Sequence, residues 1–142
     1  MEEKLLKEAL ELQHSNLFAK HNHIEGVSVE RDCAVFELTI RPESRNPYGL
    51  VHGGALYGMA DNAAGFAAHT DGRFYVTQTS TMHFLRGKYE GTVTATAKVR
   101  HRGKSTCLVN VDLTDEKGVL IASGEYTFFC VNQTIVEQEL KK

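Results

Sequence analysis

The sequence has no apolar run that approaches the roughly 18 residues needed to span a bilayer. Its first residues, Met1 to Lys4, are polar and acidic, without the basic start and apolar core of a signal peptide. Cysteine is also scarce: three residues lie far apart, without a C-x-x-C pair, so we interpret them as packed, reduced thiols. We therefore expect a soluble chain in the cytoplasm that has no membrane partner.

An excess of basic residues is missing as well. The 16 Lys and Arg residues face 18 Asp and Glu residues, for a formal net charge of -2, whereas a nucleic-acid-binding domain usually carries clustered positive charge. No P-loop or G-x-G-x-x-G motif is present, which argues against the nucleotide folds that contain them. There is no repeat or linker, so we expect one domain over residues 1–142, with a helical segment at 1–20 and a tail at 132–142.

Two segments have the pattern of helices. Residues 2–13 show the spacing of an amphipathic helix, and Ser15 or Asn16 could cap a short second helical turn. A longer helix is predicted from about residue 53 to 70, where apolar residues, mostly alanine, surround nearly the whole circumference. Such a helix is expected to be buried, so the acidic residue Asp61 in its middle is unusual.

The rest of the chain alternates with a period of two, which is typical of strands. Two strands are predicted between residues 26 and 40, and a loop at 41–52 holds both prolines. Four longer strands follow, at about 73–86, 91–101, 105–114 and 119–131. Their short connections imply a mostly antiparallel sheet. This order predicts an α+β fold, in which a curved, mostly antiparallel six-stranded sheet wraps a long central helix.

The start of the predicted helix is suited to polarising a carbonyl group. Gly53 and Gly54 supply the first backbone N–H groups, which lack intrahelical partners and lie at the positive end of the helix dipole. Glycine also lets a substrate oxygen approach closely, as an oxyanion hole requires. Asn46 could hydrogen-bond beside the same loop, and His52 could hold the loop in shape. Asp61 could act as a general base on water or attack a carbonyl directly, although a buried Asp can also be structural.

The spacing within this group predicts an assembly. Asp61 lies eight residues beyond Gly53, or about 12 Å along the helix axis at 1.5 Å per residue. The backward tilt of helical side chains recovers only part of that separation, so the two residues of one chain cannot contact the same substrate carbon. If both are catalytic, one site combines Gly53 of one chain with Asp61 of another. We therefore expect a homodimer with two equivalent interface sites, and a dimer of dimers stays open.

The segment from Asn46 to Gly54 reads N-x-x-G-x-x-H-G-G, and an Asp follows seven residues after the last Gly. This motif and the order of the elements resemble the PaaI-like (phenylacetate-degradation) branch of the hotdog-fold thioesterases, roughly from Asn16 to Val131. The resemblance implies a hotdog fold and hydrolysis of an acyl-CoA thioester to a carboxylic acid and free CoA. It also implies subunits that pair along their sheet edges, with active sites between the two helices.

The resemblance further implies a Ser or Thr near the catalytic carboxylate. Thr77, Thr79 and Thr81 should share one face of their strand because strand side chains alternate. Alignment on Phe84 favours Thr77 as the catalytic threonine, while the count from Asp61 favours Thr79. We choose Thr77.

Members of this family also bind the phosphates of CoA at a basic turn between late strands. The corresponding residues here run from Val99 to Thr106, and Arg and Lys recognise phosphate groups well. Arg86 and Lys88 could add to the same positive field. The residues expected to bind substrate are His52, Gly54, Arg102, Gly103 and Lys104.

Two other functions stay open. A hotdog hydratase or dehydratase needs an acid–base pair that commonly includes a His, whereas His52 lies on the loop and is not paired with Asp61. A non-catalytic acyl-CoA-binding protein has no need of a buried carboxylate. No metal site is predicted, because His21 and His23 have no third ligand at a useful spacing, and the proposed chemistry needs no cofactor. The sequence does not specify the acyl group.

Overall fold

The computed structural model describes residues 3–4, 7–8, 11, 15–132, 138 and 141–142. Most of the helix predicted for residues 2–13 and most of the tail predicted at 132–142 lie outside these residues. In chain order, the elements are α2 (Leu17–His21), β1 (Ile24–Glu30), β2 (Cys33–Thr39), the 3-10 helix η1 (Pro42–Ser44), α3 (Gly53–His69), β3 (Phe74–Phe84), β4 (Thr92–Arg102), β5 (Thr106–Thr114) and β6 (Leu120–Val131).

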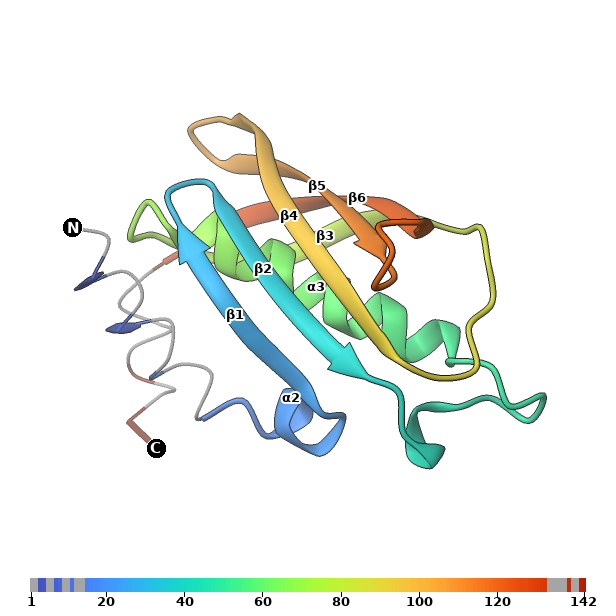
Figure 1. Ribbon diagram of the computed structural model, residues 1–142. Helices are drawn as coiled ribbons and strands as arrows, with labels where there is room; N and C mark the ends of the chain where they lie inside the picture. The colour runs from blue at the N-terminus through green and yellow to red at the C-terminus, as the bar shows by residue number, and fades with distance from the viewer. Residues whose placement is uncertain (1–2, 5–6, 9–10, 12–14, 133–137, 139–140) are drawn as a thin grey trace.

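All six strands belong to one antiparallel sheet, in the order β1-β2-β4-β5-β6-β3. The sheet curves around α3, which runs along its concave face (Figure 1). The strands β1 and β3 form the two edges, so the sheet does not close into a barrel. The predicted α+β arrangement is confirmed, and the predicted helix and strands agree with the observed elements to within about two residues.

The helix α3 is buried because most of its side chains are small. Alanine allows the backbone of a helix to approach a sheet closely, and α3 contacts all six strands. The half-buried side chain of Asp61 lies between these buried positions. The buried residues of the helix are Leu56, Met59, Ala60, Ala63, Ala64, Ala67 and Ala68. No helix in the described part of the chain is long and apolar enough to cross a membrane.

The short helix α2 is attached to α3 beside Asp61. Asn16 is its N-cap, with Oδ1 accepting a hydrogen bond of 3.1 Å from the N–H of Ala19. The Nδ2 of Asn16 donates to Asn62 Oδ1 at 2.6 Å, and Asn62 Nδ2 donates to the carbonyl of Gly58 at 2.7 Å. Asn62 therefore fastens the start of α2 to the helix that carries Asp61.

A β-bulge in β3 decides which threonine faces the helix. Gln78 is the extra residue, so Thr77 pairs with Phe128 of β6 while Thr79 pairs with Thr127. Phe128 is a core residue, which puts Thr77 on the same side of the sheet as α3. Beyond the bulge the alternation is shifted by one residue, and Thr79 faces away from α3. The prediction that Thr77, Thr79 and Thr81 share one face is therefore wrong.

Candidate active site

Asp61 and Thr77 are in direct contact. The Thr77 hydroxyl donates to Asp61 Oδ1 at 2.6 Å, across the gap between α3 and β3. Burial raises the pKa of the Asp61 carboxyl, and the hydrogen bond from Thr77 acts in the opposite direction. The bond also fixes the orientation of the carboxylate and leaves Oδ2 available to accept a hydrogen bond or a proton from a second group. The sequence choice of Thr77 over Thr79 thus names the threonine that lies beside the carboxylate.

The backbone N–H groups at the start of α3 are unequally available. His52 is the N-cap, and its Nδ1 accepts a hydrogen bond of 2.8 Å from the N–H of Gly54. The N–H groups of Ala55 and Leu56 donate to the His52 carbonyl at 3.0 and 3.2 Å. Among the described residues, no acceptor lies opposite the N–H of Gly53. The helix therefore offers one free donor, and the predicted contact of the Gly54 N–H with substrate is not supported.

The packing around Gly53 does not require glycine. A Cβ atom added there would lie 3.5 Å from Cε1 of Phe84, which is an ordinary van der Waals contact. At Gly54 an added Cβ would lie 3.0 Å from His52 Nδ1 and would press on the cap. A glycine at position 53 keeps the space outside the free N–H open, as the close approach of a substrate oxygen requires. In contrast, the glycine at position 54 leaves room for the His52 ring that caps the helix.

The side chain of Asn46 shapes the loop before α3. Its Oδ1 accepts hydrogen bonds from the N–H groups of Tyr48 and Leu50, at 2.9 and 3.1 Å. These bonds leave Nδ2 to donate elsewhere. The loop folds back on itself, with the N–H of His52 donating to the carbonyl of Ser44 at 2.7 Å. The N–H of Asn46 donates to the carbonyl of Leu50 at 2.7 Å, so Asn46 is held opposite a residue three positions before the helix start.

Two hollows meet at the Asp61 carboxylate. A cavity of about 400 Å³ extends toward the C-terminal half of α3, and a second of about 450 Å³ extends toward its start. Asp61, Asn62 and Thr77 line both. The first cavity is also lined by Gly65, Phe66, His69, Phe74, Tyr75, Val76 and Phe128. The second is also lined by Phe18, Gly54, Tyr57 and Gly58.

Arg102 points inward rather than toward solvent. A bulge between Val99 and His101 makes Arg100 the extra residue of β4, so Arg102 pairs with the buried Cys107. Without that bulge, alternation from Val99 would put Arg102 on the outer face. Its side chain is only 15% exposed. The bulge therefore turns a residue of the predicted basic turn into the interior of the protein.

The guanidinium of Arg102 is occupied by the protein itself. It donates to Asp32 Oδ1 at 2.7 Å and to the carbonyl of Ala68 at 2.8 Å, and its Nη1 lies 2.9 Å from Asp71 Oδ2. A further bond of 3.1 Å reaches the hydroxyl of Tyr75. Arg102 thereby caps the last carbonyls of α3 and joins them to the β1–β2 turn. The donors of Arg102 have partners in the fold, so the structure does not support the predicted contact of Arg102 with the phosphates of CoA, which stays a prediction.

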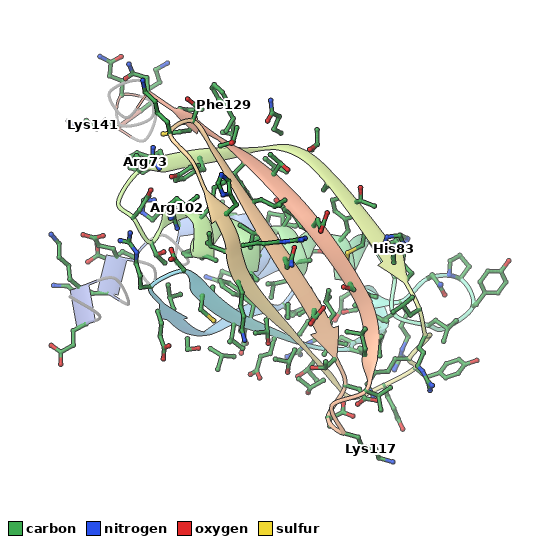
Figure 2. All side chains as sticks on the ribbon, turned by 90° about the horizontal axis from the view of Figure 1, so that it is seen from above. Arg73, His83, Arg102, Lys117, Phe129 and Lys141 are labelled. Atoms are coloured by element: carbon green, nitrogen blue, oxygen red, sulfur yellow. The ribbon has the colours of Figure 1, made fainter. Side chains whose placement is uncertain are left out.

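Asp71 is the buried counter-ion of this cluster. Burial works to raise its pKa, but hydrogen bonds from Tyr75 and Arg73 and the charge of Arg102 lower it to about 2. Burial and the hydrogen bond to Asp71 in turn raise the pKa of Tyr75 to about 12. Figure 2 shows Arg73 and Arg102 at the same end of the sheet, with His83 near the other end. The cluster locks the C-terminal end of α3 to the surrounding strands.

The rest of the basic turn remains at the surface. The carbonyls of Gly103 and Lys104 accept hydrogen bonds from Arg73, at 3.1 and 2.6 Å, while the Lys104 side chain is exposed. Arg86 and Lys88 lie before the start of β4, whereas the basic turn follows its end, about 33 Å away at 3.3 Å per residue. The expectation that all these residues share one field is wrong within a single chain.

Comparison with known proteins gives consistent results. Residues 48–122 match the family model described as "Thioesterase superfamily". The acyl-coenzyme A thioesterase PaaI of Escherichia coli is 31% identical over 123 residues, covering 86% of this chain and 88% of the relative. The 1,4-dihydroxy-2-naphthoyl-CoA hydrolase of Listeria monocytogenes is 35% identical over 108 residues, covering 73% and 87%. The solved structure of the E. coli PaaI protein superimposes with a TM-score of 0.88 at 28% identity, covering 92% of this chain and 96% of the other.

Proposed function

This chain belongs to the thioesterase superfamily and is a hydrolase of acyl-CoA thioesters, and from that premise we propose how its residues perform the reaction. Asp61 is the catalytic carboxylate, the N–H of Gly53 polarises the thioester carbonyl, and Thr77 orients Asp61. The observation that carries the proposal is the half-buried Asp61, hydrogen-bonded to Thr77 where two cavities meet. Asn46 assists through its free Nδ2.

The chemistry needs one carboxylate and one strong donor. Asp61 either removes a proton from a water molecule that attacks the carbonyl carbon, or attacks that carbon itself before water completes hydrolysis. The carbonyl oxygen becomes negative in the tetrahedral intermediate, and the free N–H at the positive end of α3 stabilises that charge. The C–S bond then breaks, and the CoA sulfur leaves and takes up a proton. No metal or redox cofactor takes part in this scheme.

A second subunit completes the site. Because α3 is one continuous helix from Gly53 to His69, its Gly53 and Asp61 stay about 12 Å apart. The strand β3 is an edge of the sheet with 11 residues and is unpaired on one side. We propose that β3 pairs with β3 of a second copy, which extends the sheet and places the two α3 helices side by side. Each site then takes Gly53 from one subunit and Asp61 from the other.

The contacts within one chain fix the register of that pairing. Thr77 touches Asp61, and Phe84 lies against Gly53. To bring the partner's Gly53 to Asp61, Thr77 must lie opposite Phe84 of the partner subunit, which, with Gln78 as the extra residue, centres the two-fold axis on Thr81. Thr77 and Phe84 both face the helix side of the sheet, as a cross-strand pair requires. Pairing further into a dimer of dimers remains an expectation.

The same register brings together basic groups that one chain keeps apart. Lys104 lies beside Arg73 at the start of β3, and Arg86 follows the end of β3. Antiparallel pairing places these two ends next to each other across the interface. We propose that Lys104 of one subunit and Arg86 of the other attract the phosphates of CoA, with the backbone of Gly103 shaping the turn. This replaces the role predicted for Arg102.

We also propose the cytoplasm as the location. Cys33, Cys107 and Cys130 are all free thiols. Cys107 is fully buried, and burial raises the pKa of its thiol, which makes it a packing residue rather than a reactive one. Three unpaired cysteines suit a reducing compartment.

Release of free thiol tests the proposed function. The purified chain is mixed with acetyl-, butanoyl-, hexanoyl-, benzoyl- and phenylacetyl-CoA, and the thiol is detected chromogenically. Hydrolysis of at least one thioester, lost in the Asp61→Asn variant, is expected. Binding of acyl-CoA without thiol release would instead identify a sensor, and addition of water to an enoyl-CoA would identify a hydratase. His52 caps α3 through Nδ1, which leaves it unpaired with Asp61 and disfavours the hydratase.

A further inference from the structure

Tyr126 is a buried tyrosine whose hydroxyl bonds to the backbone of α3. The residue lies in β6, and its side chain is fully buried in the apolar core. A hydroxyl in such surroundings needs a partner, because burying it unpaired costs free energy. The hydroxyl donates to the carbonyl of Tyr57 at 3.0 Å. A phenylalanine would fill nearly the same space, so packing accounts for the ring of Tyr126 but not for its hydroxyl.

The accepting carbonyl belongs to the turn of α3 that carries Asp61. In an α-helix the N–H of each residue donates to the carbonyl four residues earlier, so the Tyr57 carbonyl also accepts from the N–H of Asp61. A carbonyl has two lone pairs and can serve both donors. Because helical side chains tilt toward the N-terminus, the carboxylate of Asp61 lies back over this same turn. The Tyr126 hydroxyl and the Asp61 backbone thus share one acceptor.

Neighbouring groups fix the position of the Tyr126 ring. It lies edge-on to the ring of Tyr57, with 5.6 Å between the centroids, and stacks on Phe128 at 6.4 Å. A Cβ added at Gly124 would lie 3.4 Å from its Cε2 atom, so the ring also passes close to the backbone of β6. Burial and the nearby charge of Asp61 raise the pKa of the phenol, which therefore keeps its proton and its bond at neutral pH.

We infer that Tyr126 is a positioning residue for Asp61. Two neighbouring strands then hold the carboxylate in place. The strand β3 does so through the Thr77 hydroxyl, which bonds the carboxylate, and β6 does so through the Tyr126 hydroxyl, which bonds the helix turn beneath it. The two strands are paired, with Tyr126 opposite Ser80, so one ladder sets both contacts. The inference rests on the function proposed above, in which Asp61 is the catalytic carboxylate.

The Tyr126→Phe variant removes the hydroxyl and keeps the ring. Without the bond the turn that carries Asp61 can shift relative to Thr77, and a displacement of about 1 Å can cost about 100-fold in rate. For the acyl-CoA that the unaltered chain hydrolyses fastest, we expect kcat to fall about 5- to 20-fold, while KM changes less than about twofold. A weaker Thr77 bond lets the pKa of Asp61 rise, which moves the acid limb of the pH–kcat profile to higher pH. The variant leaves in place the other titratable groups that line the cavities at Asp61, which are Tyr57, His69 and Tyr75.

Thr70→Val is the matched control. The Thr70 hydroxyl is also buried and also donates to a carbonyl of α3, that of Ala67 at 2.8 Å, but it lies at the C-terminal end of the helix. Both variants lose a buried hydrogen bond and should unfold at a lower temperature. Only Tyr126→Phe should lower kcat and move the acid limb. An equal loss of kcat in Thr70→Val overturns the inference, because stability alone would then explain both losses.

A double-mutant cycle with Thr77→Val completes the test. If both hydroxyls position one carboxylate, the loss of kcat in the double variant should be clearly smaller than the product of the two single losses. Independent, multiplicative losses overturn the inference. So does a Tyr126→Phe variant that unfolds at a lower temperature but keeps the kcat and the pH profile of the unaltered chain. Absence of thiol release by the unaltered chain, or full activity of Asp61→Asn, refutes the proposed function instead.

Discussion

The hydroxyl of Thr77 donates a hydrogen bond of 2.6 Å to Asp61 Oδ1, and this bond opposes the effect of burial on the carboxyl. Burial favours the protonated acid, whereas the bond favours the ionised form. Neither residue could take this role without the bulge at Gln78, which turns Thr77 toward the helix. The sequence motif thus identifies the helix residue of this pair, Asp61, whereas the β-bulge determines that Thr77 is the strand residue that contacts it.

The Thr77→Val variant should lose the hydrogen bond and keep the shape of the side chain. A bond to an ionised group contributes about 1.5–3 kcal/mol, so kcat at neutral pH should fall roughly 10- to 100-fold. Without the bond the pKa of Asp61 rises further, which moves the acid limb of the pH–kcat/KM profile to higher pH. Thr77→Ser should restore both the rate and the limb. A profile identical to that of the unaltered chain would show that Thr77 does not tune Asp61.

The Asp61→Asn variant should separate catalysis from stability. Thiol release should fall at least about 100-fold, because the base or nucleophile is gone. Folding raises the pKa of the Asp61 carboxyl, so keeping this group ionised in the folded chain costs free energy. This destabilisation is present at pH values above the raised pKa, where the carboxyl is ionised. The neutral amide should therefore give an equal or higher unfolding temperature at pH 7, with the difference shrinking as the pH is lowered. Large destabilisation at pH 7 would assign Asp61 a structural role.

Replacement of Gly53 by Pro should remove the single free donor at the helix start. Proline is well tolerated at the first helical position, and the ψ of 135° at His52 suits a residue before proline. The fold should persist while kcat falls about 10²- to 10³-fold, the range for loss of an oxyanion donor. Circular dichroism and thiol release measure the two effects. Gly54→Pro is the matched variant: it removes an N–H that already bonds His52, so its main effect should be on stability.

Mixed dimers should reveal whether each site is shared between subunits. Gly53→Pro and Asp61→Asn, each inactive alone, are co-expressed with different affinity tags or mixed after reversible unfolding. Random pairing makes half of the dimers mixed, and each mixed dimer has one intact site, so activity should return to about one quarter of the unaltered level. If each site lay within one chain, every subunit would remain defective and mixing would restore nothing.

The Asp71→Asn variant should be destabilised in a pH-dependent way. It removes one of the two carboxylates that pair with the buried Arg102 and leaves Asp32 as the other, which costs up to about 3 kcal/mol at pH 7. The pKa of about 2 lies below the ordinary value, so the stability from ionised Asp71 is present above pH 4 and is lost as the pH falls toward 2. Urea unfolding between pH 7 and 2 should show the two curves converging. Asp112→Asn, at an exposed position of β5, is the control and should change stability little.

The sequence predicted the elements well because their periods are long and regular. The alanine-rich run that became α3 and the four late strands are found where the patterns placed them. The loop–helix motif also identified Asp61, and the helical rise was enough to predict a shared site. The sequence could not show that the N–H of Gly53 is free while that of Gly54 is bonded. The acceptor of the Gly54 N–H is His52 Nδ1, and its position depends on the conformation of that side chain.

Two single extra residues explain the main errors. The bulges at Gln78 and Arg100 reverse the alternation that sequence reasoning extends along a strand. One turns Thr77 toward Asp61 and Thr79 away, and the other turns Arg102 from the surface into a buried cluster. Neither Gln78 nor Arg100 is a residue type that marks a bulge, since both are ordinary polar residues in a segment of polar–apolar alternation. Their placement follows from pairing between distant strands, which a local pattern does not contain.

The open edge at β3 has a consequence for how the enzyme matures. A newly folded monomer exposes the outer, unpaired edge of an 11-residue strand, including the half-exposed Val76 and Phe84, and such edges recruit other strands indiscriminately. In the proposed pairing, the partner that covers this edge also delivers the missing oxyanion donor. Protection against aggregation and the onset of turnover thus arrive in the same step. At low chain concentration the protein loses both together, so dilution should shorten its working life as well as slow its catalysis.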